Sequence, residues 1–228
     1  MRRMCSWAWR LQYEYKKSNF AQFITLTYSE DFIPQNGYLV KADLQNFFKR
    51  YRKALNAKIK DPLPLKYFAC GEYGDTTDRP HYHAILFNPE INIVENTWKK
   101  GAVHYGPVND ATIMYTLKYM VKENKRQDKP SEFQLMSKGL GTGYLDNEKN
   151  IAWHNADYEN RYHLPLHDLK VPMPRLWKQL IFPDYKRAKI NKAFKRKKAL
   201  EEPLTTKQEM EKYQQSQQKL STKKRNKI

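Results

Sequence analysis

Two histidines separated by a single residue, His81 and His83, form the first pattern in the sequence that could support chemistry. In a β-strand, alternate side chains point to the same face, so both imidazoles would lie about 7 Å apart on one side. Tyr82 would then point to the opposite face, into the core. Imidazole is a common ligand of divalent metal ions. Two histidines on a solvated strand face are the commoner occurrence of this pattern, so the pair alone does not define a metal site.

A carboxylate precedes the histidine pair at a distance that suits a hairpin. Glu72 ends one apolar, β-prone segment, residues 74–80 have the composition of a turn, and the histidines begin the next segment. A hairpin would place Glu72 alongside both imidazoles. Two imidazoles and one carboxylate leave open positions on a divalent ion, which could then polarise a phosphate oxygen. The alternative for Glu72 is a solvated carboxylate at the edge of the sheet.

A pair of tyrosines follows about thirty residues later, with helical spacing. Tyr115 and Tyr119 would lie side by side on one helix face, and Lys118 and Lys122 each follow a tyrosine by three residues. An activated tyrosine oxygen can attack phosphorus, and a metal ion and a lysine can stabilise the charge that develops on the phosphate. Cleavage would leave a 5′-phosphotyrosine and a free 3′-hydroxyl. The alternative is that the tyrosines only pack the helix onto the sheet.

The chain is strongly basic, which indicates a polyanionic partner. Its 228 residues carry a formal net charge of +18, with 29% charged, 40% hydrophobic and 14% aromatic residues. Basic residues are concentrated after residue 185, in a Lys- and Gln-rich segment. Within it, a cluster is expected to bind phosphates without reading sequence, although a solvated charged helix would look the same; it consists of Lys195, Arg196, Lys197 and Lys198.

The hydrophobic patterns predict an α+β fold that brings these residues together. Four strands are expected at residues 21–28, 65–73, 81–87 and 102–108. Helices at residues 43–58 and 90–100 complete a βαββαβ order, and further helices are expected at residues 4–17 and 111–126. This order is that of the ferredoxin-like, RRM-like fold, an antiparallel sheet with helices on one face.

The remaining sequence predicts the domain organisation and the setting. We expect one domain over residues 1–185, with an irregular extension from about residue 131, and a basic helical or disordered tail over residues 186–228. Glycines at 139, 141 and 143 could let a loop approach a phosphate, although a flexible connection is the commoner role. Two distant cysteines and the absence of an apolar leader or membrane-length segment predict a soluble, intracellular protein, and no GxxxxGK[ST] sequence is present.

Four motifs occur in an order that resembles the replication initiators of microviruses, and most closely the gokushovirus-like branch of these single-stranded DNA phages, within the HUH endonuclease superfamily. The resemblance covers residues 5–185. The motifs are Phe23-Ile24-Thr25-Leu26-Thr27-Tyr28, Cys70-Gly71-Glu72-Tyr73-Gly74, Arg79-Pro80-His81-Tyr82-His83 and the segment Tyr115-x-x-Lys118-Tyr119-x-x-Lys122. Relatives often carry a cysteine-bearing stretch before the first helix, which suggests that an N-terminal part is missing here.

The resemblance implies rolling-circle replication. His81 and His83 match the metal-binding motif, Glu72 matches the third ligand less securely, and Tyr115 and Tyr119 match the two-tyrosine motif. The expected cofactor is Mg²⁺ or Mn²⁺, and the expected substrate is a single-stranded replication origin. Host DNA polymerase and helicase are the expected partners, in the cytoplasm of the bacterial host.

Two other functions remain open at this point. A non-catalytic module could bind single-stranded nucleic acid on the same sheet through charge and stacking. The chain could also perform other HUH chemistry, as a plasmid relaxase or a single-strand transposase. Covalent attachment of the protein to cleaved DNA would distinguish the enzyme from the binding module.

Overall fold

The computed structural model of the chain describes residues 2–200 apart from 75, 119–127 and 167–168. The chain divides into two compact units, Met1–Ile181 and Phe182–Ile228, and each is considered by itself. The second unit contains the helix α7 (Asp184–Leu200). In the described part of the chain, no helix is both long and apolar enough to cross a membrane.

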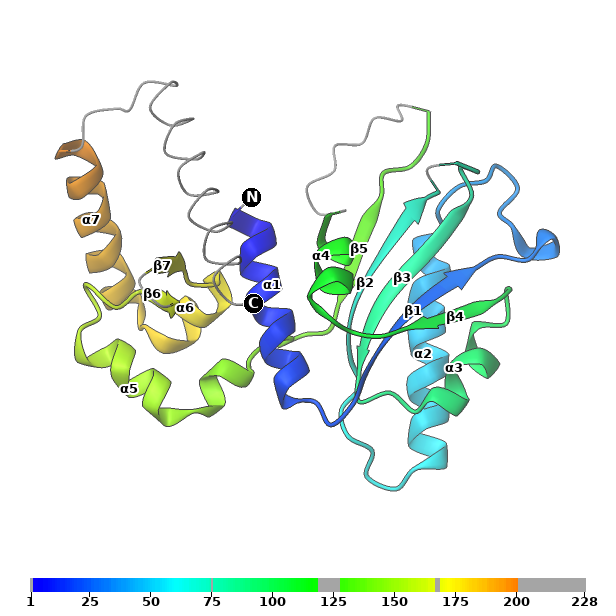
Figure 1. Cartoon of the computed structure of the whole chain (residues 1–228), viewed down its shortest axis with the longest axis horizontal. Helices are drawn as coiled ribbons and strands as arrows, with labels where there is room; N and C mark the ends of the chain where they lie inside the picture. Colours follow the sequence, from blue (N-terminus) through cyan, green and yellow to red (C-terminus); the bar gives the residue numbers. More distant parts are fainter. Residues whose placement is uncertain (1, 75, 119–127, 167–168, 201–228) are drawn as a thin grey trace, which may run out of the picture. The chain divides into compact units, whose positions relative to one another are not determined.

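A five-stranded antiparallel sheet forms the centre of the first unit, with strand order β4-β1-β3-β2-β5 (Figure 1). Its first four strands and the two helices between them follow the βαββαβ order, which confirms the predicted fold class. The elements are β1 (Ala21–Thr27), α2 (Lys41–Lys58), β2 (Lys66–Tyr73), β3 (Pro80–Phe87), α3 (Ile91–Trp98), β4 (Val103–Gly106) and β5 (Phe133–Met136).

One face of the sheet packs against α2 and α3. The apolar side chains of α2 recur at helical spacing and are all buried: Leu44, Phe47, Phe48, Tyr51 and Leu55. Tyr82, the residue between the two histidines, is fully buried on this face as predicted. Its hydroxyl lies 2.6 Å from the Tyr28 hydroxyl and donates to the Val40 carbonyl at 2.9 Å. The alternation that buries Tyr82 sends its two neighbours to the opposite face.

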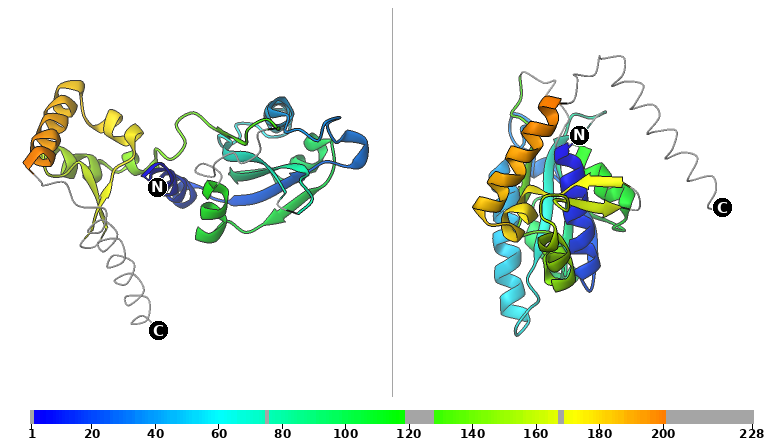
Figure 2. Two further views of the ribbon diagram at one scale, coloured as in Figure 1. Left: turned by 90° about the horizontal axis from the view of Figure 1, so that it is seen from above. Right: turned by 90° about the vertical axis from the view of Figure 1, so that its left-hand side faces the viewer.

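The opposite face carries two more helices, α1 (Arg2–Lys17) and α4 (Asp110–Lys118). Leu11 of α1 and Leu117 of α4 are fully buried in an apolar cluster with Phe68 and Ile85 of the sheet. Phe68 and Ile85 lie two residues before Cys70 and after His83, so this cluster adjoins the histidines. Figure 2 shows α2 and α4 on opposite sides of the sheet. The helices of the βαββαβ core thus lie on one face, and the additional helices cover part of the other.

The segment after residue 131, expected to be irregular, contains regular elements in the structure. β5 extends the sheet by pairing with β2, and the later elements are η2 (Gly143–Asp146), α5 (Glu148–Ala156), β6 (His163–Leu166), β7 (Leu169–Pro172) and α6 (Arg175–Ile181). Trp177 anchors this segment, since its indole stacks on Tyr144 with centroids 4.5 Å apart and donates to the Gly141 carbonyl at 2.6 Å. The strands have four residues each, too few to show a period in the sequence. A short η1 (Glu30–Phe32) follows β1.

Candidate active site

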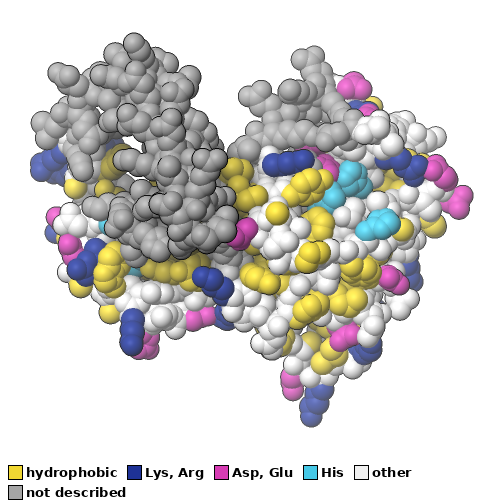
Figure 3. All heavy atoms as spheres, in the orientation of Figure 1, with side chains coloured by type: hydrophobic (Ala, Val, Ile, Leu, Met, Phe, Trp, Pro, Cys, Tyr) yellow, Lys and Arg dark blue, Asp and Glu magenta, His cyan; other side chains and the backbone are white. Residues whose placement is uncertain are grey.

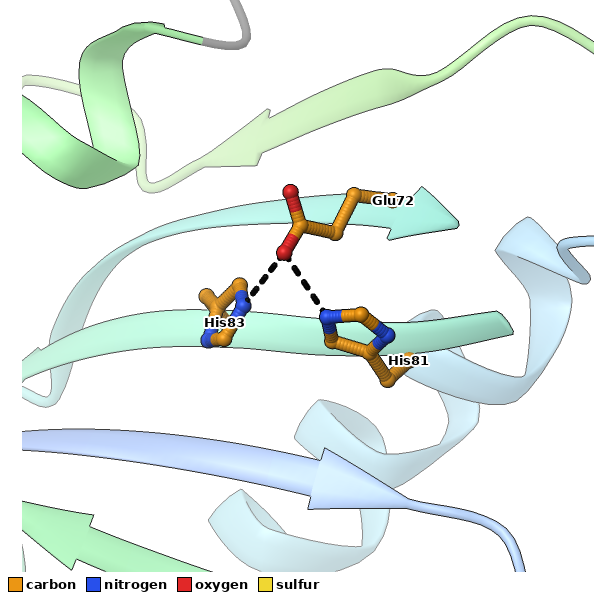
Figure 4. Close-up of side chains that lie close together, drawn as sticks. All are labelled: Glu72, His81 and His83. Carbon is orange, nitrogen blue, oxygen red and sulfur yellow. Dashed lines mark hydrogen bonds and ion pairs between the residues drawn. The ribbon is translucent and has the colours of Figure 1, made fainter. Parts of the chain in front are cut away.

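The β2–β3 hairpin brings the predicted carboxylate and both histidines together. Glu72 is paired directly with His81, and Cys70 with His83. The Nε2 atoms of His81 and His83 each lie 2.7 Å from one oxygen of Glu72, Oε1 (Figure 4). The three ligand atoms lie within 4.8 Å of one another. This is the grouping that the sequence pattern predicted.

The three side chains are shielded from water to different degrees. Glu72 is 3% exposed and His83 is 6% exposed, whereas His81 is partly buried. Glu72 is therefore not a solvated edge carboxylate, and His83 is not a surface histidine. A carboxylate buried to this degree is stabilised only by cationic or hydrogen-bonding partners.

The surroundings of the rings orient both Nε2 atoms toward Glu72. His81 Nδ1 lies 3.1 Å from the Arg79 carbonyl oxygen, which can only accept, so Nδ1 carries the proton. In neutral His81, the Nε2 lone pair then faces the carboxylate oxygen, an arrangement that requires a second proton or a cation. His83 Nδ1 lies 2.9 Å from Thr25 Oγ1. Two imidazole nitrogens and a carboxylate oxygen fit a divalent metal ion, so the residues present match a metal site.

The two histidines differ in their affinity for protons. Burial lowers the pKa of both, but at His81 the hydrogen bonds to Glu72 and to the Arg79 carbonyl outweigh burial, so its pKa is raised. At His83, burial together with the charges of His81 and Lys118 outweighs the effect of Glu72, so its pKa is lowered. His83 is therefore neutral at physiological pH, the form in which imidazole binds metal.

The helix α4 places Tyr115 at the same carboxylate. The Tyr115 hydroxyl donates to Glu72 Oε1 at 3.2 Å and lies 3.4 Å from His83 Nε2. Its side chain is 38% exposed, unlike the buried Ile113, Thr116 and Leu117 on the packing side of α4. Tyr115 is therefore not one of the residues that pack α4 onto the sheet, which was the alternative. Histidine side chains are visible at the surface over the sheet in Figure 3, so this face is open to solvent.

Lys118 accompanies Tyr115 on α4, as the spacing predicted. Its Nζ lies 4.3 Å from the centroid of the Tyr115 ring. A cation at this position can stabilise negative charge on a phosphate that contacts the tyrosine. The other half of the motif, Tyr119 and Lys122, lies outside the described residues.

The basic cluster predicted after residue 185 belongs to the second unit. Lys195 and Arg196 are exposed on α7. Lys197 and Lys198 also fall within α7, but their side chains lie outside the described set. The proposed role of this cluster in phosphate binding therefore stays a prediction.

Two residues beside the site were not anticipated from the sequence. Gln134 of β5 pairs with Cys70, which places its side chain on the face that carries the histidines. Glu132, just before β5, lies near enough for its charge to raise the pKa of His81. A four-residue strand gives no period to read, so only the three-dimensional pairing with β2 reveals them. Cys70 is buried, which raises the pKa of its thiol well above the ordinary value and keeps it protonated.

Thr25 is expected to support the metal site through His83. In Thr25→Val, the hydroxyl that orients His83 Nδ1 is lost, while the branched shape of the side chain is retained. Loss of such a contact to a ligand typically weakens metal binding by about 10- to 100-fold. The measurement is Mn²⁺ titration by calorimetry. The matched control is Thr27→Val, since the Thr27 hydroxyl lies two residues along the same strand and donates to the Ala102 carbonyl at 3.3 Å; equal affinity in both variants would contradict the role of Thr25.

The glycine-rich loop is held by protein groups, which argues against its suggested role in binding phosphate. The Gly141 amide donates to Glu14 Oε2 at 2.7 Å, and Glu14 is 3% exposed and paired with Lys66 at 3.1 Å. A carboxylate thus occupies the position that an anion would need. Gly141 also has a φ of +77°, and a Cβ there would lie 2.4 Å from Arg10 Cβ.

Gly141→Ala is expected to destabilise the fold by about 2–4 kcal/mol, because it combines an unfavourable φ with a clash against the α1 backbone. Urea unfolding followed by circular dichroism would measure this. Gly139→Ala is the matched control: it has a similar φ of +70° but nothing within 4 Å of its added Cβ. Its expected cost is about 1 kcal/mol. Equal losses in the two variants would mean that the contact with α1 does not require glycine.

Comparisons with known proteins agree with this geometry. Residues 21–124 match the family model of the phage-type replication-associated protein ORF2. Replication-associated protein ORF2 of Spiroplasma virus 4 is 28% identical over 207 residues, which cover 76% of this chain and 64% of that protein. Replication-associated protein VP4 of Bdellovibrio phage phiMH2K is 29% identical over 121 residues, covering 44% and 38%.

The chain thus spans less than two thirds of the length of the curated relatives it matches, and no solved structure matches it. Both relatives are phage proteins named for replication, and the matched region contains the sheet, the hairpin and the start of the tyrosine helix. The resemblance carried by the motifs is therefore confirmed, and the chain is a relative of the phage replication-associated proteins.

Proposed function

We propose that the chain nicks and rejoins single-stranded DNA at a specific site, to initiate and terminate rolling-circle replication of a phage genome. The observation that carries this proposal is the meeting of four groups at one oxygen. Glu72 Oε1 lies within 2.7 Å of both histidine nitrogens and within 3.2 Å of the Tyr115 hydroxyl. A candidate nucleophile is thereby fixed beside a candidate metal site.

The side chains would share the work of phosphoryl transfer. Tyr115 Oη forms the new bond to phosphorus, the bond from phosphorus to the 3′ oxygen breaks, and a 5′-phosphotyrosine results. The phenol proton passes to solvent, to which Tyr115 is open, and the departing 3′ oxygen takes up a proton to become a hydroxyl. Mg²⁺ or Mn²⁺ held by His81, His83 and Glu72 would polarise a non-bridging phosphate oxygen. Lys118 would stabilise charge on the same phosphate.

The covalent link would conserve the energy of the broken bond for rejoining. The free 3′-hydroxyl can prime a host polymerase, with a host helicase separating the strands. Tyr119 would act as the second nucleophile when the origin is regenerated, and Lys122 would assist it. The roles of Tyr119 and Lys122 rest on the sequence motif, because both lie outside the described residues.

The test is formation of a covalent protein–DNA adduct. Labelled single-stranded oligonucleotides that tile the replicon encoding the chain are incubated with the protein and Mg²⁺ or Mn²⁺, then separated on a denaturing gel. The proposal expects an adduct on the 5′ end of one downstream product and none in EDTA. Binding without any adduct would identify the non-catalytic single-strand binding module instead. Cleavage at a site unconnected with replication would favour the transposase or relaxase alternative.

A further inference from the structure

The solvent-facing side of α2 is strongly cationic. This helix carries six basic residues and a single acidic one, Asp43. Asp43 is already engaged, since it accepts from the Tyr28 hydroxyl at 2.7 Å and lies 3.3 Å from Lys100 Nζ. The exposed basic residues of α2 are Lys41, Lys49, Arg52, Lys53 and Lys58. Their charge is therefore not balanced along the helix.

A groove of about 620 Å³ runs between α2 and α3 beside this cationic side. Its charged lining consists of Arg50, Lys53, Lys58 and Lys99, and its polar lining includes Asn92 and Asn96. Among the described residues that line it, there is no carboxylate and no aromatic ring. The groove thus offers cations and amides, which are the groups that contact phosphate and sugar in protein–DNA complexes.

The groove has a fixed frame and mobile charges. Arg50 Nε donates to the Thr97 carbonyl at 2.9 Å, which ties α2 to the end of α3. Lys53, Lys58 and Lys99 are exposed, and the ion pair between Lys58 and Glu90 is long, at 3.9 Å. Such an exposed pair is weak and leaves the ammonium able to exchange partners. Lys99 stands at φ 57°, a left-handed position at which glycine is usual after a helix.

This groove lies on the other side of the sheet from the candidate active site. α2 and α3 pack on the face that contains Ile24 and Leu26, whereas Tyr115 approaches from α4 on the opposite face. The views in Figure 2 show the two helices α2 and α4 separated by the sheet. A nucleotide bound at Tyr115 does not reach the groove directly, so the groove is a separate surface.

We propose that the groove between α2 and α3 binds the phosphate backbone of duplex DNA next to the nicking site. Recognition of single strands typically combines a cationic track with exposed aromatic rings on which bases stack. The lining of this groove has the cations without the rings, which suits a duplex whose bases are already stacked. The proposal relies on the proposed function for the presence of DNA, but the binding surface itself does not depend on catalysis.

The test compares two triple variants of the full chain with the same loss of charge. The groove variant is Lys53→Gln/Lys58→Gln/Lys99→Gln, and Arg50 is left intact because it holds α3. The control is Lys16→Gln/Lys138→Gln/Lys149→Gln, three lysines exposed elsewhere on the first unit. Binding of a fluorescent duplex of about 20 base pairs and unrelated sequence is measured by anisotropy in EDTA at several salt concentrations. Because other parts of the chain are also basic, the difference between the two variants is the readout.

The groove variant is expected to bind the duplex about 10- to 100-fold more weakly than the control at about 0.1 M salt, with a salt slope smaller by about 2 to 3. Its adduct formation on a short single strand should stay within about twofold of the control. Equal duplex affinities in the two variants would overturn the proposal. A larger loss for a single strand than for the duplex would also overturn it, by making the occupant a single strand. Because the duplex measurement needs no cleavage, it remains informative even if no adduct forms.

Discussion

The covalent adduct is expected to fall by about 10³-fold or more in Tyr115→Phe, measured as the initial rate of adduct formation on a labelled single-stranded origin. The substitution removes only the hydroxyl that lies 3.2 Å from Glu72 Oε1, and with it the nucleophilic oxygen. The ring keeps its edge-on contact with His83, at 5.1 Å between centroids, so the metal site should persist. Unchanged Mn²⁺ affinity in this variant would separate loss of the nucleophile from loss of the site.

Two further variants make this result decisive. Tyr105→Phe removes a phenol of nearly the same exposure, 39% against 38%, from β4, and should form adduct at the normal rate. Tyr115→Phe/Tyr119→Phe should form none. A normal adduct in Tyr115→Phe alone would transfer the first cleavage to Tyr119, and a normal adduct in the double variant would remove tyrosine from the mechanism.

The second large effect is expected at the metal ligands. His83→Ala should weaken Mn²⁺ binding by at least about 100-fold and abolish Mg²⁺-dependent nicking, since it removes the most buried of the imidazole ligands. Glu72→Gln should have an effect of the same order, because an amide oxygen carries no charge to offset that of the ion. Calorimetric titration measures the affinity, and the adduct assay measures the consequence.

The control for these ligands is another histidine of the same sheet. His104 pairs with Thr25 on β4 and is exposed, and it is not part of the group that could hold a metal. His104→Ala should bind Mn²⁺ normally. An ion at about 100 times its Kd stabilises the protein by about 2.7 kcal/mol, so Mn²⁺ should raise the Tm of His104→Ala but not that of His83→Ala. Normal Mn²⁺ binding by His83→Ala would exclude this histidine as a ligand.

Much of the fold could be predicted because its determinants are local. The apolar spacing of α2 and the composition of the β2–β3 hairpin define elements that each span seven or more residues. β5 could not be predicted in this way, since its four residues acquire their strand conformation by pairing with the exposed edge of β2. The helix α5 was missed for a related reason: its sequence EKNIAWHNA has no continuous apolar stripe, and of its side chains only His154 is buried.

The candidate site shows the same division between local and long-range information. Strand alternation was enough to place His81 and His83 on one face, and the short turn brought Glu72 beside them. The Arg79 carbonyl and the Thr25 hydroxyl, which orient the rings, could not be predicted because the sequence does not give ring rotation. Thr25 lies on a predicted strand, but its pairing with His83 depends on β1 lying next to β3, a contact across 58 residues.

The convergence of three elements on a single oxygen of Glu72 has a consequence for how such a site can change during evolution. β2 supplies the oxygen, β3 supplies two nitrogens that approach it, and α4 supplies a hydroxyl. A substitution at Glu72 therefore alters the surroundings of the ion and of the nucleophile in the same step. Lineages that exchange one metal for another must change the strand pair and the helix together, so these positions are inherited as one character.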